Sequence, residues 1–107
     1  MKVSAIFILL TLSTVTYAQN SDYEYCIIWG VASAANDNFT LNLADKILDK
    51  KGISLDKVCS TLKQTSYKQG QQWSKGNTTN KDVMQSWFIY QNFRDKVMNK
   101  LIDILKL

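Results

Sequence analysis

Two cysteines, Cys26 and Cys59, most constrain how this chain folds. The first eighteen residues predict export from the cytosol, and the compartment decides whether two cysteines form a disulfide. Lys2, an apolar run and the small-x-small end Thr16-Tyr17-Ala18 are typical of a secretory signal peptide that is cleaved after residue 18. The apolar run is interrupted by Ser and Thr and falls short of the roughly 20 residues of a membrane-spanning helix, so we expect no membrane anchoring after cleavage. An even cysteine count in a small exported chain favours one disulfide. The alternative is a pair of buried free thiols.

The mature chain is expected to be a single helical domain over residues 19–107, with the signal peptide at 1–18. A domain of this size buries only about 60 to 65% of its unfolded surface, so its stability depends on a covalent link. A Cys26–Cys59 bond would contribute about 3.5 to 4 kcal/mol in the chain-entropy model. It would join the first helix to the third.

The absence of His limits the chemistry that this chain can perform. A Ser-His-Asp triad, a Cys-His pair and an HExxH zinc site all require His, and the only Glu is Glu24. The cysteines have neither metal-site nor Cys-x-x-Cys spacing. We therefore predict that the protein is not an enzyme and holds no metal or cofactor.

The positive charge is mild and dispersed. The formal net charge of +4 falls to +3 when Lys2 is removed with the signal peptide. Lys and Asp are interleaved along the expected helices, which is typical of solvated helix faces rather than of a nucleic-acid interface. We therefore expect no nucleic-acid partner.

Apolar residues recur at helical spacing in four segments, 23–36, 39–50, 54–68 and 80–105. No segment keeps a strand's alternation, so we expect an all-α compact bundle of four to five helices. Gly52 should cap the second helix, Ser54 the third, and Thr79 the last. The last helix would be about 35 Å long, so a break near Gln91 would keep it within the domain. The third helix is expected to bury one stripe, formed by Leu55, Val58, Cys59 and Leu62.

A polar stretch, residues 70–80, is expected to form the main loop. Trp73 within it either folds back onto the core or presents a contact to a partner, whereas Trp29 and Trp87 lie on apolar helix faces and are expected in the core. Asn38 and Asn77 each begin an Asn-x-Ser/Thr pattern, which is weak evidence of a glycosylated secreted protein.

Several short motifs follow one another along the mature chain: Tyr25-Cys26-Ile27, Asp37-Asn38-Phe39-Thr40, Ile53-Ser54-Leu55-Asp56, Asn80-Lys81-Asp82-Val83-Met84-Gln85-Ser86 and Tyr90-Gln91-Asn92-Phe93. In their order and spacing, the chain resembles the small periplasmic immunity proteins that protect bacteria against type VI secretion amidases. It departs from that family at Ser86, where a second Cys often follows the Met of the last helix.

The resemblance implies an all-helical, often dimeric inhibitor that occludes the active-site groove of a Cys-His peptidoglycan amidase. On this hypothesis the protein is periplasmic, and a helix and a loop cover the groove. The loop contacts would come from Trp73, Ser74, Lys75, Gly76 and Asn77. Two alternatives stay open. One is a periplasmic acid-stress chaperone, and the other is a secreted eukaryotic ligand-binding protein.

Overall fold

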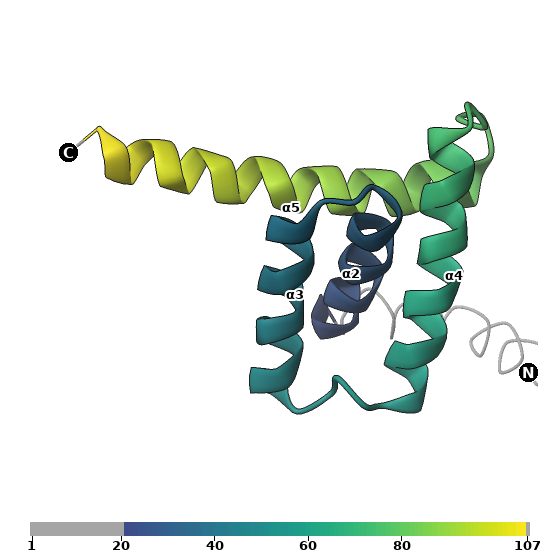
Figure 1. Cartoon of the computed structure of the whole chain (residues 1–107), viewed down its shortest axis with the longest axis horizontal. Coiled ribbons are helices and arrows are strands. Elements are labelled where there is room, and N and C mark those ends of the chain that lie inside the picture. The colour runs from purple at the N-terminus through teal and green to yellow at the C-terminus, as the bar shows by residue number, and fades with distance from the viewer. Residues whose placement is uncertain (1–20, 107) are drawn as a thin grey trace, which may run out of the picture.

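The computed structural model describes residues 21–106, and the signal peptide expected at 1–18 lies outside the described residues. The described chain is all-helical, and a disulfide joins Cys26 to Cys59, as the sequence predicts. Helices α3 and α4 lie on either side of α2, and α5 crosses one end of this group (Figure 1). The elements are η1 (Ser21–Tyr23), α2 (Glu24–Ala34), α3 (Asn38–Lys51), α4 (Lys57–Ser74) and α5 (Lys81–Leu105).

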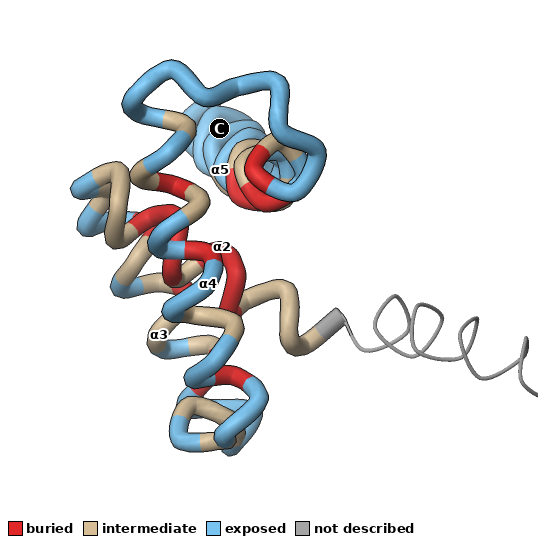
Figure 2. Tube along the Cα trace, turned by 90° about the vertical axis from the view of Figure 1, so that its right-hand side faces the viewer, coloured by how far each residue is buried: buried red, intermediate tan, exposed pale blue. Residues whose placement is uncertain are grey.

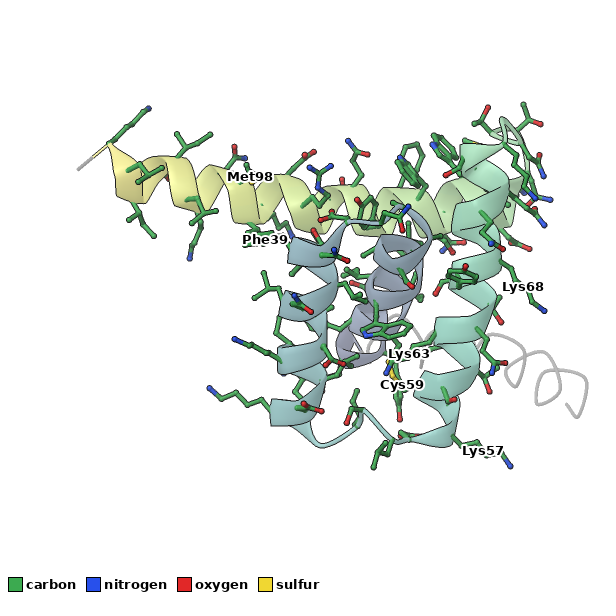
Figure 3. The ribbon with its side chains drawn as sticks, in the orientation of Figure 1. Phe39, Lys57, Cys59, Lys63, Lys68 and Met98 are labelled. Carbon is green, nitrogen blue, oxygen red and sulfur yellow. A yellow bond between two sulfur atoms is a disulfide. The ribbon has the colours of Figure 1, made fainter. Side chains whose placement is uncertain are left out.

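Helices α2 and α4 meet backbone to backbone, and two glycines make this contact. A Cβ atom on Gly30 would lie 2.5 Å from the carbonyl oxygen of Lys63, and one on Gly70 would lie 2.8 Å from the Cβ of Ala34. The disulfide joins the same two helices beside Leu48 of α3 (Figure 3). The sequence prediction that the disulfide joins the first and third helices is confirmed.

The core surrounds α2, which is buried over most of its circumference. Buried residues concentrate in α2 and in the part of α5 that crosses it (Figure 2). Trp29 and Trp87 pack against this core while staying half-buried, so their predicted position at the core is confirmed. The main cluster consists of Ile27, Ile28, Val31, Ala32, Ala44 and Tyr90.

Helix α3 is capped at both ends. The carboxylate of Asp37 accepts a hydrogen bond from the backbone N–H of Thr40 at 3.2 Å. At the other end Gly52 adopts the left-handed conformation with φ 75°, as predicted, and the N–H of Ile53 donates to the carbonyl of Leu48. These caps fix the length of the helix that forms one wall of the site described below.

Two other predicted caps are wrong by one or two residues. Helix α4 is capped by Asp56 rather than Ser54, because the Asp56 carboxylate accepts from the N–H of Val58 and from the Tyr23 hydroxyl, at 2.9 and 2.6 Å. Asn80 caps α5 instead of Thr79, since its side-chain oxygen accepts from the two N–H groups of Asp82 and Val83. Ser, Thr, Asp and Asn are all preferred N-cap residues, so the type of side chain alone does not decide between candidates that lie one or two positions apart.

The later start of α4 also changes its buried stripe. Leu55 precedes the helix and is 96% exposed, and Val58 is exposed as well, so their expected burial is wrong. The buried residues of α4 are Cys59, Ser66 and Gly70. The burial of Cys59 is therefore confirmed, and Leu62 packs against the core as predicted. Farther along α4 the buried residues are small because α2 approaches too closely for larger side chains.

The long loop and the helix break are both absent from the described chain. Helix α4 continues through Gly70 to Ser74, which leaves only residues 75–80 as the connection. Helix α5 runs without a break past Gln91, because nothing such as Pro or Gly interrupts it. Its C-terminal half extends beyond α3 instead of staying within the domain (Figure 1).

The α2–α4 contact predicts the effect of Gly30→Ala. The added methyl group would meet backbone that cannot move aside. We therefore expect the free energy of unfolding, measured in urea, to fall by about 2 kcal/mol, even though Ala in place of Gly stabilises a helix by about 1 kcal/mol. Asn42→Ala, at an exposed position on α3, is the control and should change stability by less than about 0.5 kcal/mol. A Gly30→Ala protein as stable as the wild type would contradict the close approach.

Candidate functional site

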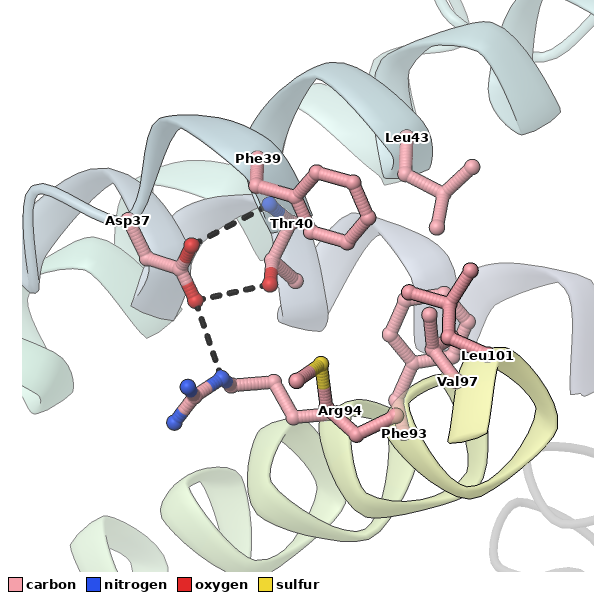
Figure 4. A pocket seen from close by; sticks show the side chains of 9 residues that line it. Asp37, Phe39, Thr40, Leu43, Phe93, Arg94, Val97 and Leu101 are labelled. Atoms are coloured by element: carbon pink, nitrogen blue, oxygen red, sulfur yellow. Dashed lines mark hydrogen bonds and ion pairs between the residues drawn. The ribbon is translucent and has the colours of Figure 1, made fainter. Parts of the chain in front are cut away.

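A cluster of polar groups around Asp37 joins the start of α3 to α5. One carboxylate oxygen of Asp37 accepts hydrogen bonds from the hydroxyls of Thr40 and Tyr90, each at 2.7 Å. The guanidinium Nε of Arg94 lies 3.2 Å from the same oxygen (Figure 4). Since Tyr90 and Arg94 belong to α5, this cluster fixes where α5 leaves the bundle.

These contacts determine the charges of the cluster. Burial alone would raise the pKa of the Asp37 carboxyl, but hydrogen bonds from Thr40 and Tyr90, together with the Arg94 charge, hold that pKa below its usual range. Burial, and then the hydrogen bond to Asp37, raise the pKa of Tyr90 to about 12. At neutral pH the cluster therefore pairs a carboxylate with a neutral phenol and a guanidinium.

An apolar groove begins beside this cluster, where α5 passes over the first turns of α3. Its volume is about 380 Å³. Phe39 and Met98 mark its two sides in Figure 3, and Figure 4 shows its walls at close range. Asp37, Thr40 and Arg94 form the polar end of the groove. Its apolar walls are Phe39 and Leu43 of α3 and Phe93, Val97, Met98 and Leu101 of α5.

Beyond the groove, no element of the described chain covers α5. Every residue from Met98 to Lys106 is exposed, including Ile104 at 59% and Leu105 at 82%. We call residues 97–105 the overhang. Its apolar side chains continue the α5 wall of the groove to where α3 no longer lies beside it, so the groove and the overhang form one surface.

A second depression, of about 460 Å³, lies between α5 and the start of α2. Glu24, Lys96 and Lys100 contribute charged groups to its lining. Because charged and apolar side chains alternate there, it is a weaker candidate for apolar recognition than the α3–α5 groove.

The structure brings the predicted partner-binding residues together at the end of α4, far along α5 from the overhang (Figure 1). Trp73 and Ser74 are the last helical residues, and Lys75, Gly76 and Asn77 begin the connection. Gly76 has φ 97°, and the side-chain amide of Asn77 donates to Gln72 at 3.1 Å. Residues 74–80 are all exposed.

Trp73 folds back onto α5, which was one of the two alternatives for its position. Its ring stacks on that of Trp87 with centroids 5.0 Å apart and planes inclined by 7°. Trp87 in turn contacts Tyr90, at 5.1 Å between centroids. The stack ties the α4–α5 turn to the core, and the partner role of these residues stays a prediction.

The α3–α5 groove was not found from the sequence. Asp37 stands out in the sequence only as the first residue of the motif Asp37-Asn38-Phe39-Thr40, and its contact with Tyr90 spans 53 residues and leaves no local pattern. Arg94 occupies a position with apolar spacing in α5, and this irregularity was the only signal of a polar contact on that face. The exposure of the overhang could not be predicted because helical spacing alone predicts burial.

No protein family matches this chain, and no curated protein or solved structure is significantly similar to it. Among residues 21–106, no group of three or more His, Cys, Asp or Glu side chains is arranged to hold a metal ion. None of the helices in that part of the chain has the length and apolar character needed to cross a bilayer. A functional conclusion therefore depends on the surface of the described chain.

The Asp37 cluster predicts a specific pH dependence of stability. Because the folded-state pKa of Asp37 is lowered, its contribution is complete above the unfolded-state pKa of about 3.9 and is lost as the pH falls through the lower folded-state value. Asp37→Asn should reduce the free energy of unfolding by about 1 to 3 kcal/mol at pH 7. The difference from wild type should shrink below pH 4.

Urea unfolding of both proteins between pH 2 and pH 7 measures this difference. Asp49→Asn, at an exposed position on α3, serves as the matched control and should leave stability within about 0.5 kcal/mol of wild type. A constant difference between Asp37→Asn and wild type across the whole pH range would mean that the charge of Asp37 does not stabilise the fold.

Proposed function

We propose that this chain is a helical protein-binding module, without enzymatic activity, that works outside the cytosol. Its binding surface is the α3–α5 groove together with the overhang, and its ligand is an amphipathic helix of a protein partner. The single observation behind this proposal is the exposed apolar face of α5 beyond Val97. Contiguous apolar surface of this kind, bordered by polar residues, is typical of protein-interaction sites.

The dimensions and chemistry of the groove suit a helix. Its apolar walls come from two different helices, α3 and α5, so they can receive side chains spaced three and four residues apart on a third helix. The Arg94 guanidinium at its polar end is bound to Asp37 through Nε, which leaves its other nitrogens available for carbonyl or carboxylate oxygens at the end of a docked helix.

The extracytoplasmic setting is supported by the disulfide. Disulfides persist in oxidising compartments such as the periplasm and the exterior of the cell, and Cys26 and Cys59 are bonded. Whether the location is periplasmic or secreted depends on the organism, and the predicted signal peptide is compatible with both.

Inhibition of a Cys-His peptidoglycan amidase, which the family resemblance suggests, is a second proposal and uses a different surface. Steric occlusion requires a rigid body with a protruding contact and no catalytic groups of its own. The disulfide and the caps supply rigidity, and the exposed connection at 75–80, anchored by the Trp73–Trp87 stack, supplies a protrusion. In this second proposal the contacts to the enzyme come from residues 73–77.

Affinity capture with variant baits tests the binding surface. The baits are wild type, Leu101→Asp in the groove, Lys75→Glu in the α4–α5 connection, and Leu55→Asp as an exposed apolar control outside both surfaces. We expect one defined protein to bind wild type and Leu55→Asp at neutral pH, and its retention to fall at least tenfold with Leu101→Asp. The captured protein is then purified and its affinity is measured directly. If it is an amidase, its hydrolysis of peptidoglycan is titrated with wild type.

The baits separate the outcomes. A partner lost only with Lys75→Glu would contradict the groove assignment and favour the α4–α5 connection. A partner retained equally by every bait would contradict both surfaces. Broad capture of many proteins only below about pH 4 would favour the acid-stress chaperone.

A further inference from the structure

The overhang has two opposite faces of different chemistry. Successive residues of an α-helix are turned by about 100° around its axis, so the apolar side chains of the overhang cover an arc of about 160°. Polar residues occupy most of the remaining circumference. The apolar residues form three adjacent pairs, Val97-Met98, Leu101-Ile102 and Ile104-Leu105. These pairs are spaced almost evenly about Leu101, so reversing the direction of the helix places apolar residues on apolar residues.

We infer that the helix received by the α3–α5 groove is the overhang of a second copy of this chain, with the two α5 helices antiparallel about a two-fold axis between Lys100 and Leu101. This inference rests on the proposed function and names the partner of the same surface. In a two-fold dimer each surface must be complementary to itself. Each copy would place Ile104 and Leu105 toward Phe39 and Leu43 of the other, so that both grooves are filled at once.

Charge complementarity supports the antiparallel direction. Asp95 and Lys106 are exposed on the same flank of the apolar face, and neither forms an ion pair within the described chain. They lie 11 residues apart, about 16 Å along one helix, so they cannot meet within a copy. An axis between Lys100 and Leu101 places Asp95 of each copy beside Lys106 of the other. Lys100 itself lies on the opposite flank, where it shares a depression with Glu24.

The shape of the surface favours a helix over a membrane. Phe39 and Leu43 lie on α3, in the corner between α3 and α5, where a helix can reach them and a flat bilayer cannot (Figure 4). Asp95 and Asp103 are interleaved with Lys96, Lys100 and Lys106 along this part of α5, which weakens any attraction to anionic lipid.

The area available sets the strength of association. Covering the exposed apolar side chains and the flanking charges on both copies would bury on the order of 1,000 Å² in total, at the lower end of specific interfaces. The dimer should therefore dissociate on dilution. The two α4–α5 connections would lie at its outer ends, so residues 73–77 stay accessible to a different protein (Figure 1).

Analytical ultracentrifugation of the oxidised protein, purified from an export-competent host, tests this inference between about 1 µM and 1 mM. Wild type should shift from monomer to dimer within this range, and Leu101→Asp should stay monomeric. Asp95→Lys and Lys106→Asp should each raise the dimer dissociation constant about tenfold. The double variant Asp95→Lys/Lys106→Asp should return to within about threefold of wild type. Leu55→Asp is the control and should dimerise normally, and circular dichroism checks that every variant is helical.

Several outcomes would overturn the second-copy inference. These are a wild type that stays monomeric up to 1 mM, dimerisation that Leu101→Asp does not weaken, and a charge-swapped double variant that fails to recover. Sedimentation with vesicles of phosphatidylcholine and phosphatidylglycerol, by a protein that stays monomeric, would overturn it in favour of a membrane surface. Because these measurements use pure protein, a monomeric wild type that still captures a partner through Leu101 would reject the dimer and leave the proposed function standing.

Discussion

The backbone contact between α2 and α4 is the constraint on which the remaining structure depends. Gly30 and Gly70 let the two helices approach until only hydrogen fits at these positions, and the Cys26–Cys59 bond holds the same pair covalently. This contact occupies one side of α2, so the remaining apolar groups of α2 must be covered by α3 and α5. A small chain thereby gains an ordered core around a single central helix.

The position of α5 follows from this core and from one carboxylate. Tyr90 is buried in the main cluster, and its hydroxyl donates a hydrogen bond to Asp37. Core packing and this hydrogen bond therefore hold the same turn of α5 in place. Arg94, one turn later, is the last residue of α5 tied to the bundle by an ion pair among the described residues. Beyond Val97 the helix extends away from the core, which explains why its apolar face is left exposed. This exposed face is suited to binding.

The sequence was sufficient for the features that depend on local patterns. Helical spacing predicted the all-α class, export and an even cysteine count predicted the disulfide, and Gly52 was correctly identified as a cap. Exact cap positions were wrong where two good N-cap residues lie near each other, as with Thr79 and Asn80. The groove could not be predicted because it joins residues about 50 positions apart, and because apolar periodicity does not distinguish a buried face of α5 from an exposed one.

Amide hydrogen exchange along α5 tests most directly whether the overhang is an unpartnered binding surface. In dilute protein, we expect amides around Tyr90 to exchange only by global unfolding, and amides from Leu101 onward to exchange at least a hundredfold faster because few contacts hold the last turns. Raising the protein concentration, or adding the partner captured by the wild type, should slow exchange in the overhang selectively. Overhang amides that are as protected as Tyr90 in dilute protein, or that do not respond to either addition, would contradict the account.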